Sequence, residues 1–512
     1  MVLRSDERAP DHPMSQIPTF GLDRWFRRGP TDGAPRRVAT WVGTWTVVIL
    51  VAAMIGVAAN GGERVALALG GVLFVFGIFV ADPVLLVVMV LPGSLLLQRV
   101  GGASTNLSVA DLLVFMGAVV CLFHVHWREA PYLRQFFHGI VWYQAALILV
   151  VVANPNRYDI IEWFHRLSYL GGSVLVGWTI ARFGRCRQAF RLFLWGAVLV
   201  AVISVEQAVA THFLPAQWGG YQKNSIGAIM WVAVVVAQLN PPWTGIGRTE
   251  ARVAKYVCFC GLLASQSRQA AVCLILALVA ATLLNPDVRR RSKLMLLGCA
   301  PLVVALYYSF TLAARNNPKF NSVSIRVDQI GAAFHVWHLS PMLGEGMRFY
   351  DLPQFLYVTA PPNVLIDNLA STGIVGSLAF FYLVFVTMRT MSRLPRLLGT
   401  LGLVILLGHY VDGLFDIFWI GSNMIPPLVI VGMSLGVADV DRRDRYSQAG
   451  SHLGLAVTGR PDRPDRPDRP DRPDRPRPSS GWAPGAVARW AGNSLVMPFR
   501  TALGTHPGPE PL

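Results

Sequence analysis

Long apolar runs recur along most of the chain, and they limit the folds that it can adopt. Many approach the roughly 20 residues that an α-helix needs to cross the hydrocarbon core of a bilayer. A soluble core would hide one or two such runs, but they recur from residue 39 to residue 437 in a chain that is 53% hydrophobic and 14% charged. The sequence therefore predicts an all-α integral membrane protein with about 12 to 14 transmembrane helices.

The limits of the apolar runs give the predicted spans. Two runs, near 84–98 and 254–265, are short enough to be tilted or re-entrant. The predicted spans lie near residues 39–59, 64–80, 84–98, 109–125, 138–153, 166–182, 189–209, 224–239, 254–265, 268–284, 293–313, 367–388, 397–411 and 419–437.

The distribution of basic residues predicts the orientation. The net charge is +16, but the arginines gather in short segments between apolar runs, as the positive-inside rule expects of cytoplasmic loops. This pattern argues against a nucleic-acid partner. With the N-terminus inside, every cluster falls on the cytoplasmic side; the clusters lie at 24–37, 185–187, 248–255, 289–293 and 389–396.

Composition changes at both ends of the apolar body. Residues 1–38 form a basic leader, and five consecutive Pro-Asp-Arg triplets fill residues 461–475. Such a repeat favours an extended, low-complexity chain that buries no core. We expect a cytoplasmic N-terminal segment (1–38), a membrane domain (39–437) and a disordered cytoplasmic tail (438–512).

The longest predicted outer loop, about residues 314–366, carries a helical pattern. Apolar side chains recur at helical spacing, Pro341 ends the pattern, and Gly344-Glu345-Gly346 predicts a turn. We expect a helix on the outer membrane surface, with its first arginine either snorkelling to the interface or binding a ligand. The residues on or near its predicted face are Arg326, Ile330, Phe334, His335, Trp337 and His338.

Two basic positions on the outer side are candidates for binding phosphate. Ser265-Gln266-Ser267-Arg268 lies between two short apolar runs, which predicts the outer tip of a helical hairpin. An arginine at the membrane indicates a functional site, although contact with lipid phosphate is the alternative. Arg268 and Arg326 together would cradle a diphosphate, because guanidinium groups bind phosphate oxygens bidentately. Lys223, which opens another helix from outside, is a further candidate.

A polar motif closes the outer loop. Asn363 is followed by nine residues and then by Gly373 and Gly376 at the mouth of a membrane helix. Glycines let backbones approach closely, and non-helical backbone at membrane depth survives only beside protein or a wet cavity. The motif predicts part of a site. Asp412 and Asp416 would share a helix face and bind an acceptor or a cation, unless they are solvated interfacial carboxylates.

Taken in order, these motifs resemble the O-antigen ligase and O-antigen polymerase superfamily over roughly residues 40–437. An early Ser-x-x-Asp stretch before a helix adds to the resemblance. The motifs that carry it are Ser108-x-x-Asp111, Ser267-Arg268, Arg326 to Trp337 and Pro341, Gly344-x-Gly346, and Asn363-x9-Gly373-x-x-Gly376.

The resemblance implies a glycosyltransferase that needs no metal or other cofactor. Such an enzyme takes glycan from a polyprenyl-diphosphate carrier outside a bacterial cytoplasmic (inner) membrane and passes it to a glycan or lipid acceptor. Arg268 and Arg326 would engage the diphosphate. Substrate binding would involve Lys223, Gly344, Gly346, Asn363, Gly373 and Gly376. The cytoplasmic tail would contact other glycan-assembly proteins.

The chain departs from the family pattern at one position. Ligases of this family carry a histidine before the amide of the last motif, as the expected base, and here that residue is Pro362, which has no proton chemistry. Candidates to replace it are His335, His338 and Asp367. Two other functions stay open: a transporter or flippase for lipid-linked sugars, and a non-catalytic membrane partner of a glycan-assembly complex.

Overall fold

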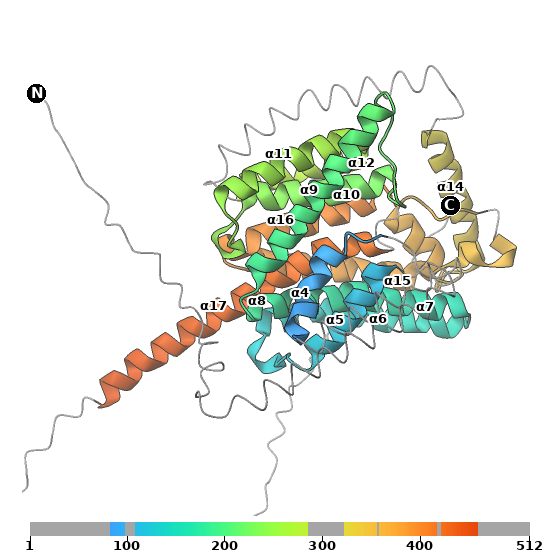
Figure 1. The fold of residues 1–512 in the computed structure, drawn as a ribbon. Helices are drawn as coiled ribbons and strands as arrows, with labels where there is room; N and C mark the ends of the chain where they lie inside the picture. Colours follow the sequence, from blue (N-terminus) through green and yellow to red (C-terminus); the bar gives the residue numbers. More distant parts are fainter. Residues whose placement is uncertain (1–81, 98–107, 285–321, 356–357, 417–420, 459–512) are drawn as a thin grey trace, which may run out of the picture. The chain divides into compact units, whose positions relative to one another are not determined.

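Helices make up the fold of the residues that the computed structural model describes, which are 82–97, 108–284, 322–355, 358–416 and 421–458 (Figure 1). The predicted spans 39–59, 64–80 and 293–313 and the Pro-Asp-Arg repeat lie outside these residues. The main helices are α4 (Pro83–Gly93), α5 (Val109–Leu122), α6 (Pro131–Ala153), α7 (Arg157–Leu167), α8 (Ser173–Arg182), α9 (Cys186–Ala210), α10 (Lys223–Leu239), α11 (Arg248–Ser265), α12 (Arg268–Leu284), α14 (Ser322–Leu339), α15 (Val364–Ser392), α16 (Arg396–Gly413) and α17 (Ile425–Thr458).

Short turns complete the described elements. A π-helical turn, η2 (Ser168–Gly172), joins α7 to α8. The 3₁₀ turns are η1 (Trp127–Glu129), η3 (Pro242–Thr244), η5 (Phe349–Asp351), η6 (Pro353–Phe355) and η7 (Ser422–Met424).

Four of the described segments are long and apolar enough to cross a membrane: Pro131–Ala153, Cys186–Ala210, Val364–Ser392 and Ser422–Tyr446. Four shorter apolar helices accompany them, namely α4, α5, α10 and α12. The prediction of an all-α membrane protein is confirmed, whereas the total of 12 to 14 spans stays a prediction.

Polar side chains cap several of the helices. Ser108 and Asp111 form a reciprocal capping box at the start of α5, where each side chain accepts the other's backbone N–H. The Asp111 carboxylate also accepts a hydrogen bond from the Tyr169 hydroxyl, 2.8 Å away. The predicted Ser-x-x-Asp stretch is therefore both a helix start and a tie between α5 and η2.

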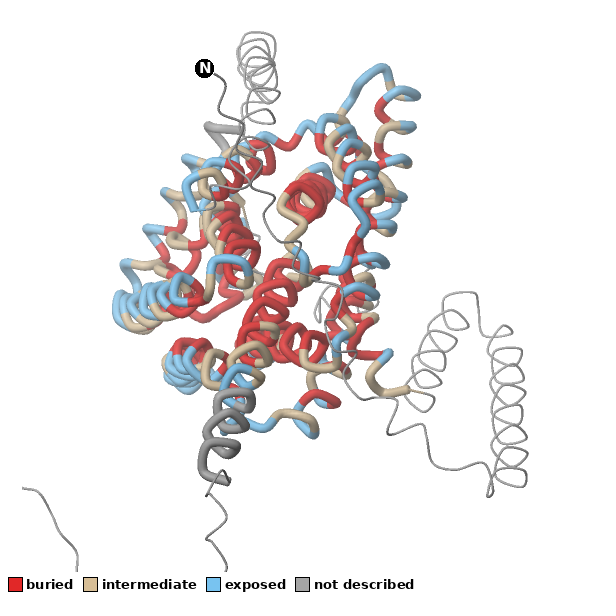
Figure 2. The backbone as a smooth tube through the Cα atoms, turned by 90° about the vertical axis from the view of Figure 1, so that its left-hand side faces the viewer, coloured by how far each residue is buried: buried red, intermediate tan, exposed pale blue. Residues whose placement is uncertain are grey.

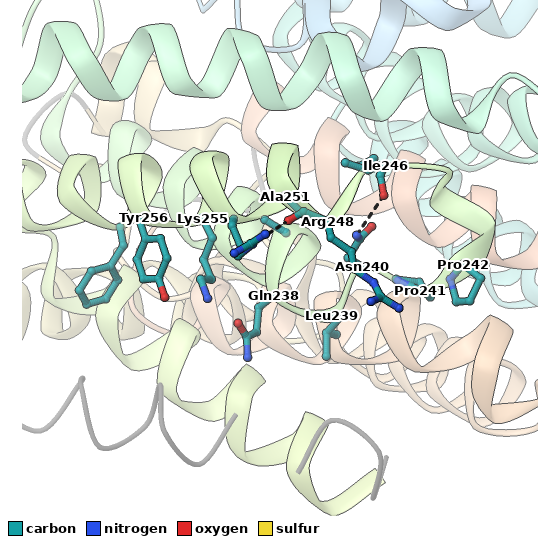
Figure 3. Close-up of a pocket in the computed structure, with 13 residues that line it drawn as sticks. Gln238, Leu239, Asn240, Pro241, Pro242, Ile246, Arg248, Ala251, Lys255 and Tyr256 are labelled. Atoms are coloured by element: carbon teal, nitrogen blue, oxygen red, sulfur yellow. Dashed lines mark hydrogen bonds between the residues drawn. The ribbon is translucent and has the colours of Figure 1, made fainter. Parts of the chain in front are cut away.

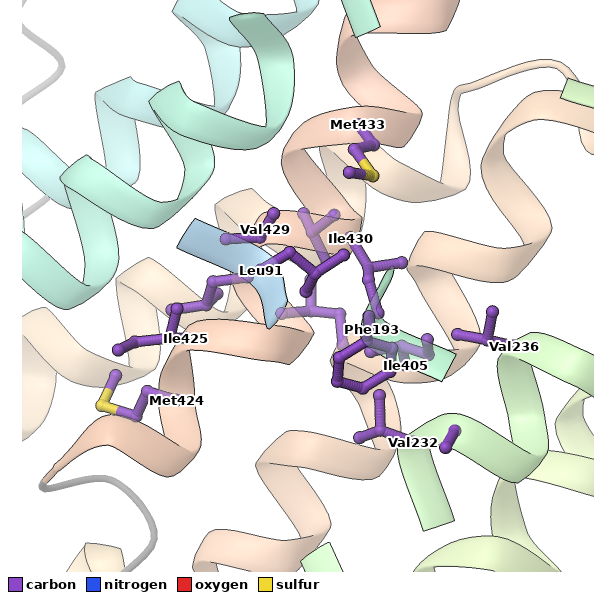
Figure 4. Packing of buried hydrophobic residues seen from close by; sticks show 14 of the residues in the cluster. Leu91, Phe193, Val232, Val236, Ile405, Met424, Ile425, Val429, Ile430 and Met433 are labelled. Atoms are coloured by element: carbon purple, nitrogen blue, oxygen red, sulfur yellow. The ribbon is translucent and has the colours of Figure 1, made fainter. Parts of the chain in front are cut away.

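Helix α10 and the first half of α17, up to Asp439, are buried on nearly all sides. Every residue of α10 from Ile226 to Gln238 is buried, as expected of a helix that is apolar all round. In the apolar window of α17, 83% of the residues are buried, against 39% in each of the other three long segments. Figure 2 shows the buried segments at the centre of the described chain, and Figure 4 shows side chains of both helices in the core they share with Phe193 and Ile405.

Helices α8 and α17 cross at backbone contact. A Cβ at Gly177 of α8 would overlap the carbonyl oxygen of Val429, and one at Gly432 would overlap that of Val174. One turn further, a Cβ at Gly436 would lie 2.6 Å from the carbonyl oxygen of Trp178. Small residues at such a crossing let two membrane helices approach closely.

The long-range polar contacts join loops that the positive-inside pattern assigns to the same face. Glu129, in a predicted cytoplasmic loop, accepts hydrogen bonds from Arg182 and Arg443, which lie in or beside two others. On the predicted outer side, the Asn154 amide donates to the carbonyl of Gly344 over 3.2 Å. This grouping supports the predicted topology, while the assignment of either face to the cytoplasm stays a prediction.

Some boundaries differ from the predicted ones. Helix α11 begins at Arg248 rather than near 254, because its first turns are polar and extend beyond the apolar run. Helix α17 continues to Thr458 rather than ending near 437. Hydropathy detects only the part of a helix that suits a membrane core.

Candidate functional site

Helix α15 is broken at Gly373, the first glycine of the predicted motif. Gly373 has φ 62° and ψ −161°, a conformation open essentially only to glycine. The break frees backbone groups on both sides, and the outer-loop segment 341–346 binds them. We term this paired region, residues 341–346 with residues 370–375 of α15, the clasp. The four hydrogen bonds of this clasp are Glu345 N to Ala370 O (3.1 Å), Gly346 N to Ser371 O (3.1 Å), Ile374 N to Pro341 O (3.0 Å) and Val375 N to Met342 O (3.1 Å).

The glycines of the motifs are explained by contacts within this clasp. A Cβ at Gly344 would lie 2.5 Å from the Ser371 carbonyl oxygen, and one at Gly373 would overlap the Met342 carbonyl. Gly376 packs against the side chain of Thr372. The close backbone approaches give Gly344 and Gly373 a packing role, Gly376 meets a side chain of its own helix, and the part of all three in substrate binding stays a prediction.

A carboxylate at the start of α7 binds the backbone just beyond Gly346, at the end of the clasp. Asp159, in the first turn of α7, accepts hydrogen bonds from the backbone N–H groups of Met347 and Arg348 and from the Asn156 amide. A Cβ at Gly346 would lie 2.5 Å from this carboxylate. Asp159 precedes the predicted span 166–182, and its burial raises its pKa from 3.8 to about 6.

Behind the clasp lies a buried ionic network centred on Arg166, near the end of α7. Its guanidinium is fully buried and donates to Glu162 Oε1 (3.2 Å), Tyr143 Oη (3.0 Å) and Asn368 Oδ1 (3.3 Å). A fourth contact, 3.5 Å long, joins its Nη2 to Asp367 Oδ2. One guanidinium thus faces two carboxylates and links α6, α7 and the outer turns of α15. Removal of one partner from such a buried set is costly.

Arg166 is not among the residues predicted for the site. One signal would have found it, because Glu162 and Arg166 are spaced i, i+4 at the edge of a predicted span. The network also gives the predicted base Asp367 a partner. Its side chain is 4% exposed and lies against Arg166, so the structure presents it to the protein interior.

Three of the predicted binding residues lie in or next to a set of hydrogen bonds around the end of α16. Asn363 caps α15 through its side-chain oxygen and donates from its amide to Leu414 O over 2.9 Å. Lys223 opens α10, and its neighbour Asn224 donates to Asp416. Arg268 opens α12, and its neighbour Ser267 donates to Asn224 Oδ1 over 3.4 Å. We term the residues in these contacts, with the adjacent Lys223 and Arg268, the outer cluster: Lys223, Asn224, Ser267, Arg268, Asn363 and Asp416.

The hairpin tip lies where the sequence predicts it, but the two aspartates near the end of α16 do not share a helix face. Gln266, at the tip between α11 and α12, has the left-handed φ of 51°, and the predicted helical hairpin is confirmed. The prediction that Asp412 and Asp416 share a helix face is wrong, because α16 ends at Gly413. Asp412 is only 2% exposed and accepts from the Trp231 indole over 3.1 Å, so it is not a solvated interfacial carboxylate.

The predicted outer-loop helix is α14, but its buried face differs from the predicted one. Ala333 and Val336 are fully buried and pack toward Ile366 and Ala370 of α15, whereas Phe334 is 37% exposed. The small alanine lets the two helices approach, and the larger aromatic ring remains outside. Helix α14 thus packs on the protein next to the clasp (Figure 1).

Helix α14 places the remaining predicted residues on one flank of α15. Arg326 lies near its start and His335 and His338 near its end; both histidines are exposed. His338 Nδ1 lies 2.6 Å from the Phe334 carbonyl oxygen. Helices α10 and α12 pack against α16, which in turn packs against α15. Arg326 and Arg268 therefore lie on helices that flank the α15–α16 pair.

Comparison with known protein families finds a match to part of the chain. Residues 253–381 match a family model described as O-antigen ligase. The matched segment contains the predicted site residues from Arg268 to Gly376, and Lys223, Asp412 and Asp416 lie outside it. No curated protein sequence matches the chain.

Proposed function

Because residues 253–381 match the O-antigen ligase family model, we propose that the chain transfers or polymerises polyprenyl-diphosphate-linked saccharide at the outer face of the inner membrane. The observation that carries the proposal is the outer cluster. Lys223 and Arg268 adjoin Asn224 and Ser267, which share a hydrogen bond, and Asn224 and Asn363 contact Asp416 and Leu414, just beyond the end of α16. A lipid-bound diphosphate is an anionic group held at this depth, and cationic side chains suit it.

The proposed reaction needs charge stabilisation more than a strong base. The acceptor hydroxyl oxygen attacks the anomeric carbon, and the bond from that carbon to the diphosphate oxygen breaks. Polyprenyl diphosphate leaves with the bonding electron pair, and Arg268 and Arg326 stabilise the negative charge that develops on it. Such electrostatic stabilisation is usually the largest contribution to catalysis.

Among the candidates to accept the hydroxyl proton, His338 is favoured. A carbonyl oxygen only accepts hydrogen bonds, so the 2.6 Å contact to Phe334 puts the proton of a neutral imidazole on Nδ1. Its Nε2 then carries a lone pair, and the side chain is exposed. Asp367 is less suited, because it is buried against Arg166.

The test is glycan transfer from a polyprenyl-diphosphate donor in reconstituted vesicles, run with and without a chelator. We expect Arg268→Ala and Arg326→Ala each to lower the transfer rate by about 10²-fold or more. Arg157→Ala, an exposed arginine on the same predicted face, is the matched control and should transfer normally. Loss of transfer in the control as well, or retention in both test variants, would refute the diphosphate cradle.

One observation favours a second candidate, a transporter of lipid-linked sugar. Transporters bind substrates at broken membrane helices, and α15 is broken beside the buried charges of the Arg166 network. Here, however, the clasp occupies the freed backbone groups, and the charges of the network face one another. Movement of donor across the vesicle membrane without any transfer would favour the transporter.

A further inference from the structure

A pocket of about 1000 Å³ lies at the end of α10 opposite Lys223, between that helix and α11 (Figure 3). It is separate from the outer cluster and lies on the face that the positive-inside pattern assigns to the cytoplasm. Neither the family resemblance nor the proposed reaction uses it.

The polar wall of the pocket is cationic. Arg248, Arg252 and Lys255 all line it and follow one another along successive turns of α11. The acidic residue in the first turn of this helix, Glu250, does not line the pocket and instead accepts hydrogen bonds from Arg191 and Trp195 of α9, both 2.9 Å long. Among the described residues that line the pocket, none is acidic.

A buried donor without a partner in the described chain lines the same pocket from α10. Gln238 is only 7% exposed and lines the pocket, and within the described part of the chain its Nε2 has no hydrogen-bond partner. An unmade hydrogen bond of a buried amide is costly, so a group that accepts it would stabilise the folded protein.

The pocket continues along α11 to an aromatic end. Tyr256 and Phe259 follow the basic residues on this helix and also line the pocket. The pocket therefore combines cations and an amide donor at one end with apolar surface at the other. A phospholipid has the same order of chemistry, with a phosphate headgroup above acyl chains.

We propose that this pocket binds the phosphate headgroup of an anionic phospholipid. Arg248, Arg252 and Lys255 hold the phosphate, Gln238 Nε2 donates to one of its oxygens, and the Tyr256–Phe259 wall covers the start of an acyl chain. A basic pocket between membrane helices on the cytoplasmic side is the usual setting for such recognition.

The test is native mass spectrometry of the full chain in detergent, titrated with phosphatidylglycerol, with phosphatidylcholine and with inorganic phosphate. We expect saturable binding of phosphatidylglycerol that exceeds that of phosphatidylcholine and is not displaced by millimolar phosphate. In Arg248→Ala/Arg252→Ala, affinity should fall about thirtyfold, since each basic residue near an anionic headgroup is worth about fivefold. The matched control is Arg393→Ala/Arg396→Ala, an exposed pair on the same predicted face that does not line the pocket.

A second variant separates the ligand from simple surface charge. Gln238→Leu keeps the charge of the wall but removes the unpaired donor. We expect it to bind phosphatidylglycerol about tenfold more weakly, yet to unfold at the same or a higher temperature than wild type without lipid. Equal losses in both arginine pairs, an unchanged Gln238→Leu affinity, or displacement by inorganic phosphate would each overturn the proposal.

Discussion

Asp159 joins two outer loops through a single carboxylate. It lies in the first turn of α7, and its acceptor oxygens hold the backbone at Met347 and Arg348, at the far end of the clasp. Burial raises its pKa to about 6 because desolvation outweighs these hydrogen bonds. The folded protein therefore binds the Asp159 proton more tightly than the unfolded chain does.

This raised pKa predicts a pH dependence of stability. The stability that protonated Asp159 contributes is fully present below pH 3.8 and is lost as the pH rises through about 6. We expect the unfolding temperature of wild type in detergent to fall between pH 5 and pH 7 relative to that of Asp159→Asn, which cannot titrate there. A difference between the two proteins that stays constant over this interval would contradict the assignment.

At the scale of elements, the break in α15 requires glycine at position 373. Gly373→Ala introduces a side chain at positive φ and against the Met342 carbonyl. We expect a loss of about 3 kcal/mol or more of stability, from backbone strain and overpacking together. The measurement is thermal unfolding in detergent, with the yield of folded protein as a second readout.

Gly331→Ala is the matched control for that variant. Gly331 lies on the exposed side of α14, and a Cβ there meets nothing within 4 Å. Alanine favours a helix over glycine, so this variant should be neutral or more stable by up to about 1 kcal/mol. If both variants unfold like wild type, the clasp does not determine the stability of this region.

Elements were predictable from the sequence where the signal is local. Asn363 and the glycines that follow it marked the special backbone, and Ser265 to Arg268 marked the hairpin tip. Their partners were not predictable. Gly373 meets the backbone of residues 341–342, which has no side-chain signature, and Asp159 meets Met347 from 188 positions away. The local pair of Glu162 and Arg166 could have drawn attention to Arg166, but its partners Tyr143, Asn368 and Asp367 come from other helices and were not predictable.

For the whole molecule, the grouping of loop contacts predicts which residues face which compartment. Arg157 lies on the face of the clasp, and Arg128 lies beside the Glu129 ion pairs on the other face; both are exposed. In a chain whose six cysteines are replaced, we expect a membrane-impermeant maleimide to label Arg157→Cys in intact spheroplasts. Arg128→Cys should react only after permeabilisation. The reverse pattern would invert the orientation and place the outer cluster in the cytoplasm.

The position of α17 has a consequence for biosynthesis. This helix is the last described segment to leave the ribosome, yet Gly432 and Gly436 contact α8, and Asp439 accepts a hydrogen bond from the backbone of Tyr132, 307 positions earlier. The backbone N–H of Tyr132, in the first turn of α6, therefore has no Asp439 carboxylate to donate to until nearly the whole membrane domain has been translated. Nascent chains of this protein should therefore depend on insertase or chaperone protection of α6 and α8, and truncation before residue 425 should direct the chain to membrane proteolysis.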